Sequence, residues 1–288
     1  MMKIKWDKDT EEHMAVQEKE GVVYLTYPAF EKFPQFCHGF STRLGGVSQG
    51  IYSTMNLSFQ RGDLEENVSE NYRRIARAIG FDLEGAVCSQ QTHTVNIRQV
   101  KKEDGGKGIL KPLDYQDIDG LITDIPGMTL VTSFADCVPL FFMDPVHNAI
   151  GLAHSGWKGT AARMGRHMLG AMKEAFGSKS SEIYAAIGPS ICQKCYEVSQ
   201  DVAEIFFREF PQSQKEKHFI YRKDNGKYQL NLWRANEIIF LEEGIPKEHI
   251  SFPGICTCCN PELLFSHRAS KGKRGNLSAF LEIRPSME

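Results

Sequence analysis

Three continuous apolar runs in the middle of the chain limit the folds that are open to it. They cover residues 128–134, 138–143 and 149–153, and they are rich in Val, Ile, Leu and Phe. Short runs of this kind are typical of strands that are buried on both faces. The chain has 288 residues, so it is long enough to bury a sizeable core around such strands.

The rest of the chain alternates between strand and helix patterns. Apolar residues at helical spacing predict a helix over residues 63–79 with Asp63 as its N-cap, and a second helix over residues 160–176 that ends at Gly177. Further strands are predicted at 22–27, 36–42, 86–89, 95–100, 183–187, 228–230, 250–255 and 277–283, and further helices at 200–210 and 232–241. No regular strand–helix–strand repeat is present, so we expect sheets covered by helices rather than a doubly wound parallel sheet, a helical bundle or a barrel.

Charge and hydropathy exclude two classes of partner. The formal net charge is −2, and the one short basic segment, residues 270–275, is interpreted as a solvated turn, so we expect no nucleic-acid binding. The longest apolar stretch, residues 128–143, is interrupted by Asp136 and Pro139 and is shorter than the roughly 20 residues that span a bilayer. We therefore expect no membrane association.

We expect no export signal in the amino-terminal residues. Residues 1–20 are rich in Lys, Asp and Glu and lack the apolar stretch of a signal peptide, which predicts a cytoplasmic protein. Because no repeat or Pro/Ser-rich linker interrupts the chain, we expect a single catalytic domain over residues 1–288, with residues 1–20 as a polar extension.

Metal-capable side chains stand where three predicted strands end. His93 follows a short strand, Cys137 separates two buried strands, and His154 lies at the end of a third. Two imidazoles and one thiolate suit zinc and leave a fourth position open, as in catalytic sites, with Asp136 as a supporting group or base. The alternative is that these are isolated core residues, because their separations along the chain match no local metal motif.

Two glycine-rich turns offer positive charge. The turn at residues 155–159 carries Lys158 and precedes a predicted helix, and the turn at residues 41–46 carries Arg43. Exposed N–H groups and a guanidinium attract phosphate or carboxylate, although each segment is also compatible with a plain turn.

The chain has eight cysteines, five of which fall into two clusters. Cys192 and Cys195 form one cluster, and Cys256, Cys258 and Cys259 form the other. A second structural zinc site, a redox pair at Cys192 and Cys195, or thiols packed near the ends of the sheets are all compatible with this spacing.

Seven short segments, in this order, closely resemble the YfiH/YlmD family, also called the laccase-domain or multicopper polyphenol oxidase family. These segments are Thr42–Gly46, Gln91–His93, Asp119–Thr123, Ala135–Pro139, His154–Gly159, Gly188–Ile191 and Phe265–Arg268. The last departs from the family pattern at His267, where an aromatic residue is commoner. The resemblance extends over about residues 20–284.

The resemblance implies an α+β fold in which mixed β-sheets pack face to face between helices, in αββα layers similar to a cysteine-hydrolase-like toxin domain. It also implies that His93, Cys137 and His154 bind the catalytic metal, zinc or alternatively copper. The chain has nine histidines and no His-x-His pair, so the ligand count speaks against a true multicopper laccase.

The activity implied by the resemblance is that of a purine nucleoside phosphorylase. Such an enzyme converts adenosine, inosine or methylthioadenosine and phosphate into the free base and ribose 1-phosphate, and adenosine deaminase activity accompanies it. Arg43 and Lys158 would bind the phosphate. Three alternatives remain: a hydrolase of peptidoglycan precursors with Cys137 as nucleophile, a copper-dependent polyphenol oxidase, and a non-catalytic binding protein.

Overall fold

Two mixed β-sheets packed face to face form the centre of the molecule. The computed structural model describes residues 3–8, 10, 13–213 and 219–285, and all statements below refer to these residues. The first sheet has the order β1 (Ala15–Lys19), β2 (Val22–Thr26), β3 (Phe36–Ser41), β15 (Leu277–Ile283), β7 (Thr129–Phe134), β4 (Ala86–Cys88). The second has the order β14 (Ile250–Ser251), β10 (Tyr184–Ile187), β8 (Val138–Asp144), β9 (Ala149–Ser155), β6 (Gly120–Thr123), β5 (Ile97–Gln99).

Each sheet combines antiparallel and parallel pairs. β4 pairs parallel with β7 in the first sheet, and β5 with β6 and β10 with β14 pair parallel in the second. The remaining pairs in the two large sheets are antiparallel. A smaller antiparallel sheet has the order β11 (Glu197–Val198), β13 (Tyr228–Leu230), β12 (Ile220–Arg222).

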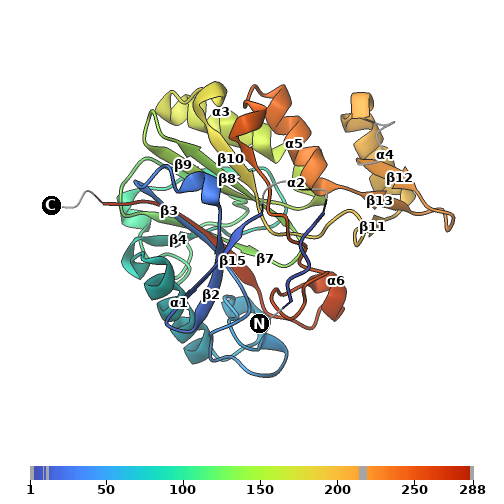
Figure 1. The fold of residues 1–288 in the computed structure, drawn as a ribbon. Helices are drawn as coiled ribbons and strands as arrows, with labels where there is room; N and C mark the ends of the chain where they lie inside the picture. The colour runs from blue at the N-terminus through green and yellow to red at the C-terminus, as the bar shows by residue number, and fades with distance from the viewer. Residues whose placement is uncertain (1–2, 9, 11–12, 214–218, 286–288) are drawn as a thin grey trace.

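Helices cover the outer faces of both large sheets. α1 (Glu65–Ile79) packs on the first sheet, while α3 (Met164–Phe176) and α5 (Leu232–Glu242) pack on the second, on the opposite side of the molecule (Figure 1). The shorter helices are α2 (Trp157–Ala161), α4 (Gln200–Glu209) and α6 (His267–Ser270). The predicted α+β fold with αββα layers is therefore confirmed.

The three apolar runs form strands that are buried on both faces, as their composition predicts. Every residue of β8 and β9 is buried. Phe141 contributes to the core between the sheets, whereas the next residue, Phe142, packs against the helices of the second layer. Successive side chains point to opposite faces of a strand, so a strand between two apolar layers has to be apolar throughout.

The predicted N-cap of the first helix is wrong. α1 begins at Glu65, and Leu64 occupies the N-cap position without a side-chain hydrogen bond. The carboxylate of Asp63 instead accepts hydrogen bonds from the Ser48 hydroxyl (2.6 Å) and the Asn56 amide (3.0 Å). It therefore binds the preceding loop.

The predicted helix over residues 160–176 is interrupted. It begins earlier, at Trp157, breaks at Arg163, which adopts a left-handed conformation (φ 60°), and resumes at Met164 before ending at Gly177 as predicted. The Arg163 guanidinium pairs with Glu242 and donates to the backbone carbonyl of Glu209. These long-range contacts are compatible with the break and are not visible in the local pattern.

Two further segments differ from their predicted structure. The strand expected over residues 250–255 ends at Ser251, because Pro253 and Gly254 (φ 61°) interrupt it, and Ile255 forms only an isolated bridge with Trp6. The segment predicted as a polar extension supplies β1, an edge strand of the first sheet. Part of residues 1–20 is thus paired with the body of the fold.

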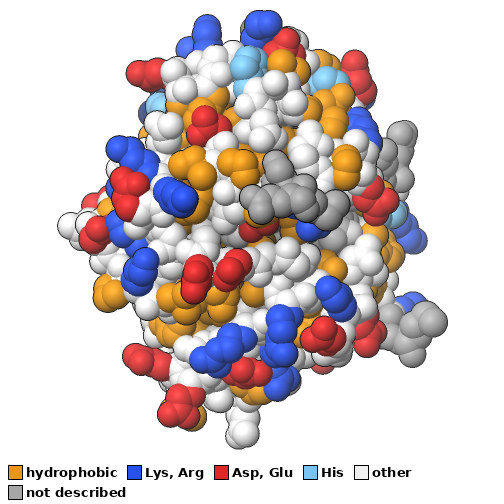
Figure 2. Space-filling view, turned by 90° about the vertical axis from the view of Figure 1, so that its left-hand side faces the viewer, with side chains coloured by type: hydrophobic (Ala, Val, Ile, Leu, Met, Phe, Trp, Pro, Cys, Tyr) orange, Lys and Arg blue, Asp and Glu red, His pale blue; other side chains and the backbone are white. Residues whose placement is uncertain are grey.

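Figure 2 shows a face on which Lys and Arg side chains are interspersed with Asp and Glu and with hydrophobic patches. Within the described part of the chain, no helix combines the length and the apolar character required to cross a membrane.

Candidate metal centre

The structure brings together the three side chains that the sequence selects as metal ligands. One ligand atom from each of His93, Cys137 and His154 lies within 4.8 Å of the other two. His93 Nε2 lies 4.0 Å from Cys137 Sγ, and the two imidazole rings meet edge to face with centroids 4.9 Å apart. Residues that are distant in the sequence therefore form one compact donor set.

The topology of the two sheets explains why these residues meet. The chain leaves the first sheet at the end of β7 and enters the second at the start of β8, and Cys137 lies in this crossing. Because Val138 pairs with Ser155 in the β8–β9 ladder, His154 is held beside Cys137. Asp136 (φ 86°) and His93 (φ 68°) adopt left-handed conformations. Residues other than glycine rarely adopt this conformation, and those that do are frequently at functional sites.

The buried carboxylate of Asp119 fixes both histidine segments. Its Oδ1 accepts a hydrogen bond from His154 Nδ1 (2.7 Å) and from the backbone N–H of His93 (3.2 Å). Its Oδ2 accepts from the backbone N–H groups of Thr92 (3.1 Å) and Thr94 (2.8 Å). Since a carboxylate only accepts, a neutral His154 imidazole carries its proton on Nδ1 and offers Nε2 as the metal-binding atom.

Electrostatic interactions make Cys137 a thiolate near neutral pH. Burial acts to raise its pKa, but His154 and His93 outweigh burial and lower the pKa to about 6. Burial acts to lower the pKa of His154, but Cys137 and Asp119 raise that pKa to about 9. Burial acts to raise the pKa of Asp119, but hydrogen bonds, chiefly from His154, lower it to about 2. The three groups therefore stabilise one another in their charged forms.

The donor set fits a zinc ion. Tetrahedral zinc with bonds of about 2.0–2.3 Å needs ligand atoms roughly 3.4–3.8 Å apart, so the observed separations require only small adjustments. Gly156 keeps the approach clear, because a Cβ there would lie 3.0 Å from Cys137 Sγ and 3.0 Å from His93 Cδ2. Three protein donors leave one position open, as in a catalytic rather than a closed site.

Asp136 positions the turn that carries Cys137. Its Oδ1 accepts a hydrogen bond from the Thr257 hydroxyl (2.6 Å), and its Oδ2 accepts from the backbone N–H of Arg268 (2.7 Å). Its backbone carbonyl accepts from Ile191 N–H (3.0 Å). These contacts favour the supporting role considered for Asp136 over the role of base.

The two cations predicted to bind phosphate have different surroundings. Arg43 donates to the backbone carbonyls of Ser53 (2.8 Å) and Pro261 (2.8 Å), and its guanidinium lies over the Phe265 ring at 4.6 Å. Lys158 is exposed on the five-residue helix α2. Arg43 thus joins two loops in addition to any role in binding phosphate. The helix at Lys158 is short, so its N-terminus does not offer an anion the end of a long helix.

Arg274 is a cation near the centre that the local sequence pattern does not reveal. The segment 270–275 is predicted as a solvated turn, but Arg274 is half-buried and interacts electrostatically with Cys137 and Asp136. Burial, with repulsion by Arg61, lowers the pKa of Arg274 to about 10, so it stays charged at neutral pH. The Nε atoms of Arg61 and Arg274 are buried without a hydrogen-bond partner in the described part of the chain.

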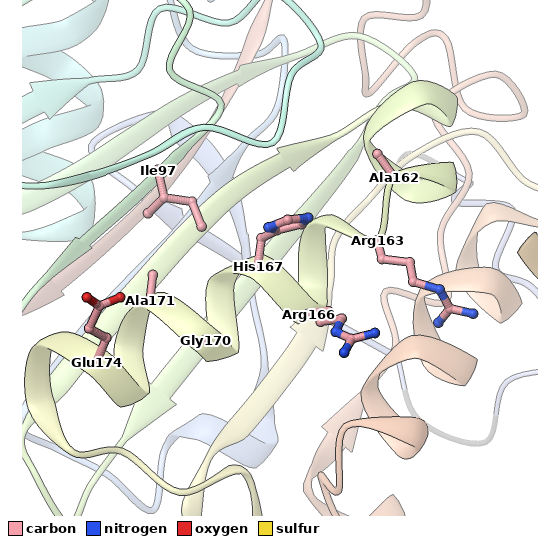
Figure 3. A pocket seen from close by; sticks show the side chains of 8 residues that line it. All are labelled: Ile97, Ala162, Arg163, Arg166, His167, Gly170, Ala171 and Glu174. Carbon is pink, nitrogen blue, oxygen red and sulfur yellow. The ribbon is translucent and has the colours of Figure 1, made fainter.

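The hollow drawn in Figure 3 is separate from this centre. It has a volume of about 640 Å³ and lies against the outer face of α3, between Ile97 and Arg163. His167 and Arg166 point along this face (Figure 3), and the lining residues include none of the three candidate ligands. The convergence of side chains, and not the size of this hollow, therefore locates the candidate centre.

The fold and the donor set define an αββα protein with a two-histidine, one-cysteine site where the chain crosses between its sheets. The chain belongs to the multi-copper polyphenol oxidoreductase laccase family, whose model matches residues 37–284. It is 38% identical over 247 residues to the purine nucleoside phosphorylase YlmD of Bacillus subtilis (strain 168), an alignment that covers 85% of this chain and 88% of that protein.

Solved structures share the same architecture. The chain resembles the crystal structure of the hypothetical protein YfiH from Bacillus licheniformis, with a TM-score of 0.86, 33% identity and coverage of 93% of this chain and 99% of that one. It also resembles the crystal structure of YlmD from Geobacillus stearothermophilus, with a TM-score of 0.84, 35% identity and coverage of 93% and 98%. The resemblance inferred from seven sequence segments is therefore confirmed.

The role of Asp119 can be tested through metal affinity. Asp119→Asn removes the charge that orients His154, and we expect zinc affinity at this centre to fall about 10–100-fold. Competition with a chromophoric chelator measures the change. Asp117→Asn is the matched control, because this exposed neighbour contacts the same loop through Thr92 but not His154. Equal affinities in the two variants would contradict the role assigned to Asp119.

The thiolate character of Cys137 predicts a pH dependence in metal-free protein. Because its pKa is lowered to about 6, the rate of its alkylation by iodoacetamide should rise with pH, reach half its maximum near pH 6 and approach that maximum at about pH 7. Burial raises the pKa of Cys88 to about 12, so this thiol should stay unmodified over the same range. Peptide mass spectrometry separates the two sites, and a midpoint near 8.5 for Cys137 would show an ordinary thiol.

Proposed function

We propose that this protein is a zinc-dependent purine nucleoside phosphorylase that also deaminates adenosine. Its proposed substrates are adenosine, inosine or methylthioadenosine together with phosphate, and its products are the free base and ribose 1-phosphate. The observation that carries the proposal is the convergence of His93, Cys137 and His154 on one point, with His154 oriented by Asp119. The name of the Bacillus subtilis relative supports the choice of substrates.

Phosphorolysis forms a bond between a phosphate oxygen and C1′ of the ribose while the bond from C1′ to the purine nitrogen breaks. The chain's contribution is to hold the anion against C1′, since two reactants fixed in the right geometry no longer pay the entropy of encounter. We assign this task to Arg43 and Lys158, and we add Arg274 because its charge interacts electrostatically with Cys137. Fixed positive charge also stabilises the charge that develops during transfer.

The same three donors support the second activity. A zinc ion held by His93, Cys137 and His154 would supply Lewis-acid polarisation of a substrate oxygen or of a water molecule. His93 is the most exposed of the three side chains, and Gly156 leaves room beside it. A purine ring can therefore approach the donor set from the side of His93.

A cysteine hydrolase is a second candidate, and one observation favours it. Cys137, His154 and Asp119 form a thiolate, an imidazole and a carboxylate in sequence, which is the arrangement of a nucleophile, its base and the group that orients the base. Peptidoglycan precursors are the substrates that the sequence suggests for this alternative. The phosphorylase and the hydrolase use the same side chains, so the requirement for metal separates them.

A turnover assay tests the proposed phosphorylase. Protein loaded with zinc should release adenine or hypoxanthine only when phosphate is present, and Cys137→Ala should lower kcat/KM by about 100-fold or more because it removes a group at the reacting centre. Liquid chromatography of base and ribose 1-phosphate measures the reaction. Cys258→Ser is the control, since this thiol belongs to neither metal-capable cluster.

Two outcomes of the assay would contradict the proposal. Base release that does not depend on phosphate would show a hydrolase. Metal-free protein that keeps full activity and loses it on alkylation of Cys137 would show a cysteine nucleophile instead of a metal centre.

The assignment of Arg274 predicts a selective kinetic defect. Arg274→Gln should raise the KM for phosphate about tenfold or more while changing the KM for the nucleoside little, because a charge-assisted contact contributes about 1.5–3 kcal/mol. Lys273→Gln removes an exposed charge from the adjacent position and should leave both constants unchanged. An equal rise of both KM values in Arg274→Gln would indicate a general structural defect.

A further inference from the structure

A second metal-capable cluster lies in two loops that the proposed reaction does not use. Cys192 and Cys195 follow β10, and Cys256 and Cys259 follow β14. The four sulfur atoms all lie within 4.8 Å of one another. Among them, Cys195 Sγ and Cys259 Sγ are 3.4 Å apart, and Cys192 Sγ and Cys259 Sγ are 4.0 Å apart.

These separations match four sulfurs around one ion. Tetrahedral zinc with Zn–S bonds of about 2.3 Å places its sulfurs about 3.8 Å apart, between the two measured distances. A disulfide would need about 2.05 Å, and all four cysteines are free thiols. The four thiolates of an iron–sulfur cube each bind a different iron and so stand farther apart than ligands of a single ion.

The backbone around the cluster has the form of a preorganised ligand turn. The N–H groups of Cys195 (3.1 Å) and Tyr196 (3.0 Å) both donate to the Cys192 carbonyl, which folds the Cys-x-x-Cys segment into a tight turn. The Cys192 N–H donates to Cys256 Sγ (3.2 Å), a contact that favours the thiolate form. A backbone bridge between Ser190 and Cys256 holds the two loops in register.

We propose that Cys192, Cys195, Cys256 and Cys259 bind a structural zinc ion in a closed, four-sulfur site. Four protein ligands complete a tetrahedral shell and leave no position for substrate, unlike the open three-ligand centre. The ion would join the loop after β10 to the loop after β14, which the backbone bridge between Ser190 and Cys256 also connects. This proposal does not depend on the proposed phosphorylase activity.

The site stands close to the turn that carries Cys137. Thr257, between two of the cysteines, donates its hydroxyl hydrogen bond to Asp136. Arg268 donates from its backbone N–H to Asp136 (2.7 Å) and from its guanidinium to the Cys195 carbonyl (3.3 Å). An ion that fixes the two cysteine loops would thereby also position Asp136 and, through it, the first centre.

Zinc analysis of the Cys137→Ala variant tests the proposal, because this substitution disables the first centre. Elemental analysis of the full-length variant should give about one zinc per chain, and zinc X-ray absorption should show four sulfur ligands at about 2.3 Å. Adding Cys195→Ser should reduce the bound zinc to a small fraction, whereas adding Cys258→Ser should leave one zinc with the same four-sulfur shell.

Three results would overturn the proposal. The first is a Cys137→Ala variant without zinc after purification in the presence of zinc. The second is a ligand shell dominated by nitrogen or oxygen. The third is a disulfide between two of the four cysteines in anaerobically purified protein, seen as a mass lower by two hydrogens, which would identify a redox pair. Because the first measurement needs no change in the cluster itself, a failure of Cys195→Ser to fold leaves the test intact.

Discussion

The buried carboxylate of Asp119 is the interaction on which the candidate centre depends. It lies immediately before β6, and it binds His154 on the neighbouring strand and the backbone of the loop that carries His93. A charged group with no exposure is stable only when its oxygens are fully hydrogen-bonded. The same contacts that satisfy this charge therefore select the His154 tautomer, shape the His93 loop and favour the charged form of Cys137.

The layers of the fold were predictable because a strand that is buried on both faces has a continuous apolar sequence. β8 and β9 are buried at every residue because a core lies on each side of the second sheet, as the neighbouring residues Phe141 and Phe142 of β8 show. What the local pattern missed was set by contacts between distant residues. The break at Arg163 accompanies contacts with Glu242 and Glu209. The isolated β-bridge between Trp6 and Ile255 joins segments that are far apart in the sequence.

Some residues of the candidate site were likewise predictable from the sequence, and others were not. The ligands His93, Cys137 and His154 were found because strand ends and family-like segments mark them, whereas Asp119 appeared only within such a segment and Arg274 only within a basic turn. Asp119 matters through its hydrogen bonds, and Arg274 through its electrostatic interaction with the centre. The spacing of residues along the sequence predicts neither interaction. The two cysteine pairs likewise become one cluster only when β10 and β14 pair side by side.

Anomalous diffraction above and below the zinc absorption edge, from crystals grown with zinc and phosphate, tests the central claim most directly. The account predicts a peak bonded to Cys137 Sγ, His93 Nε2 and His154 Nε2, with one position left to a non-protein ligand. Protein that catalyses phosphorolysis in solution, yet shows no peak among these three atoms, would contradict it.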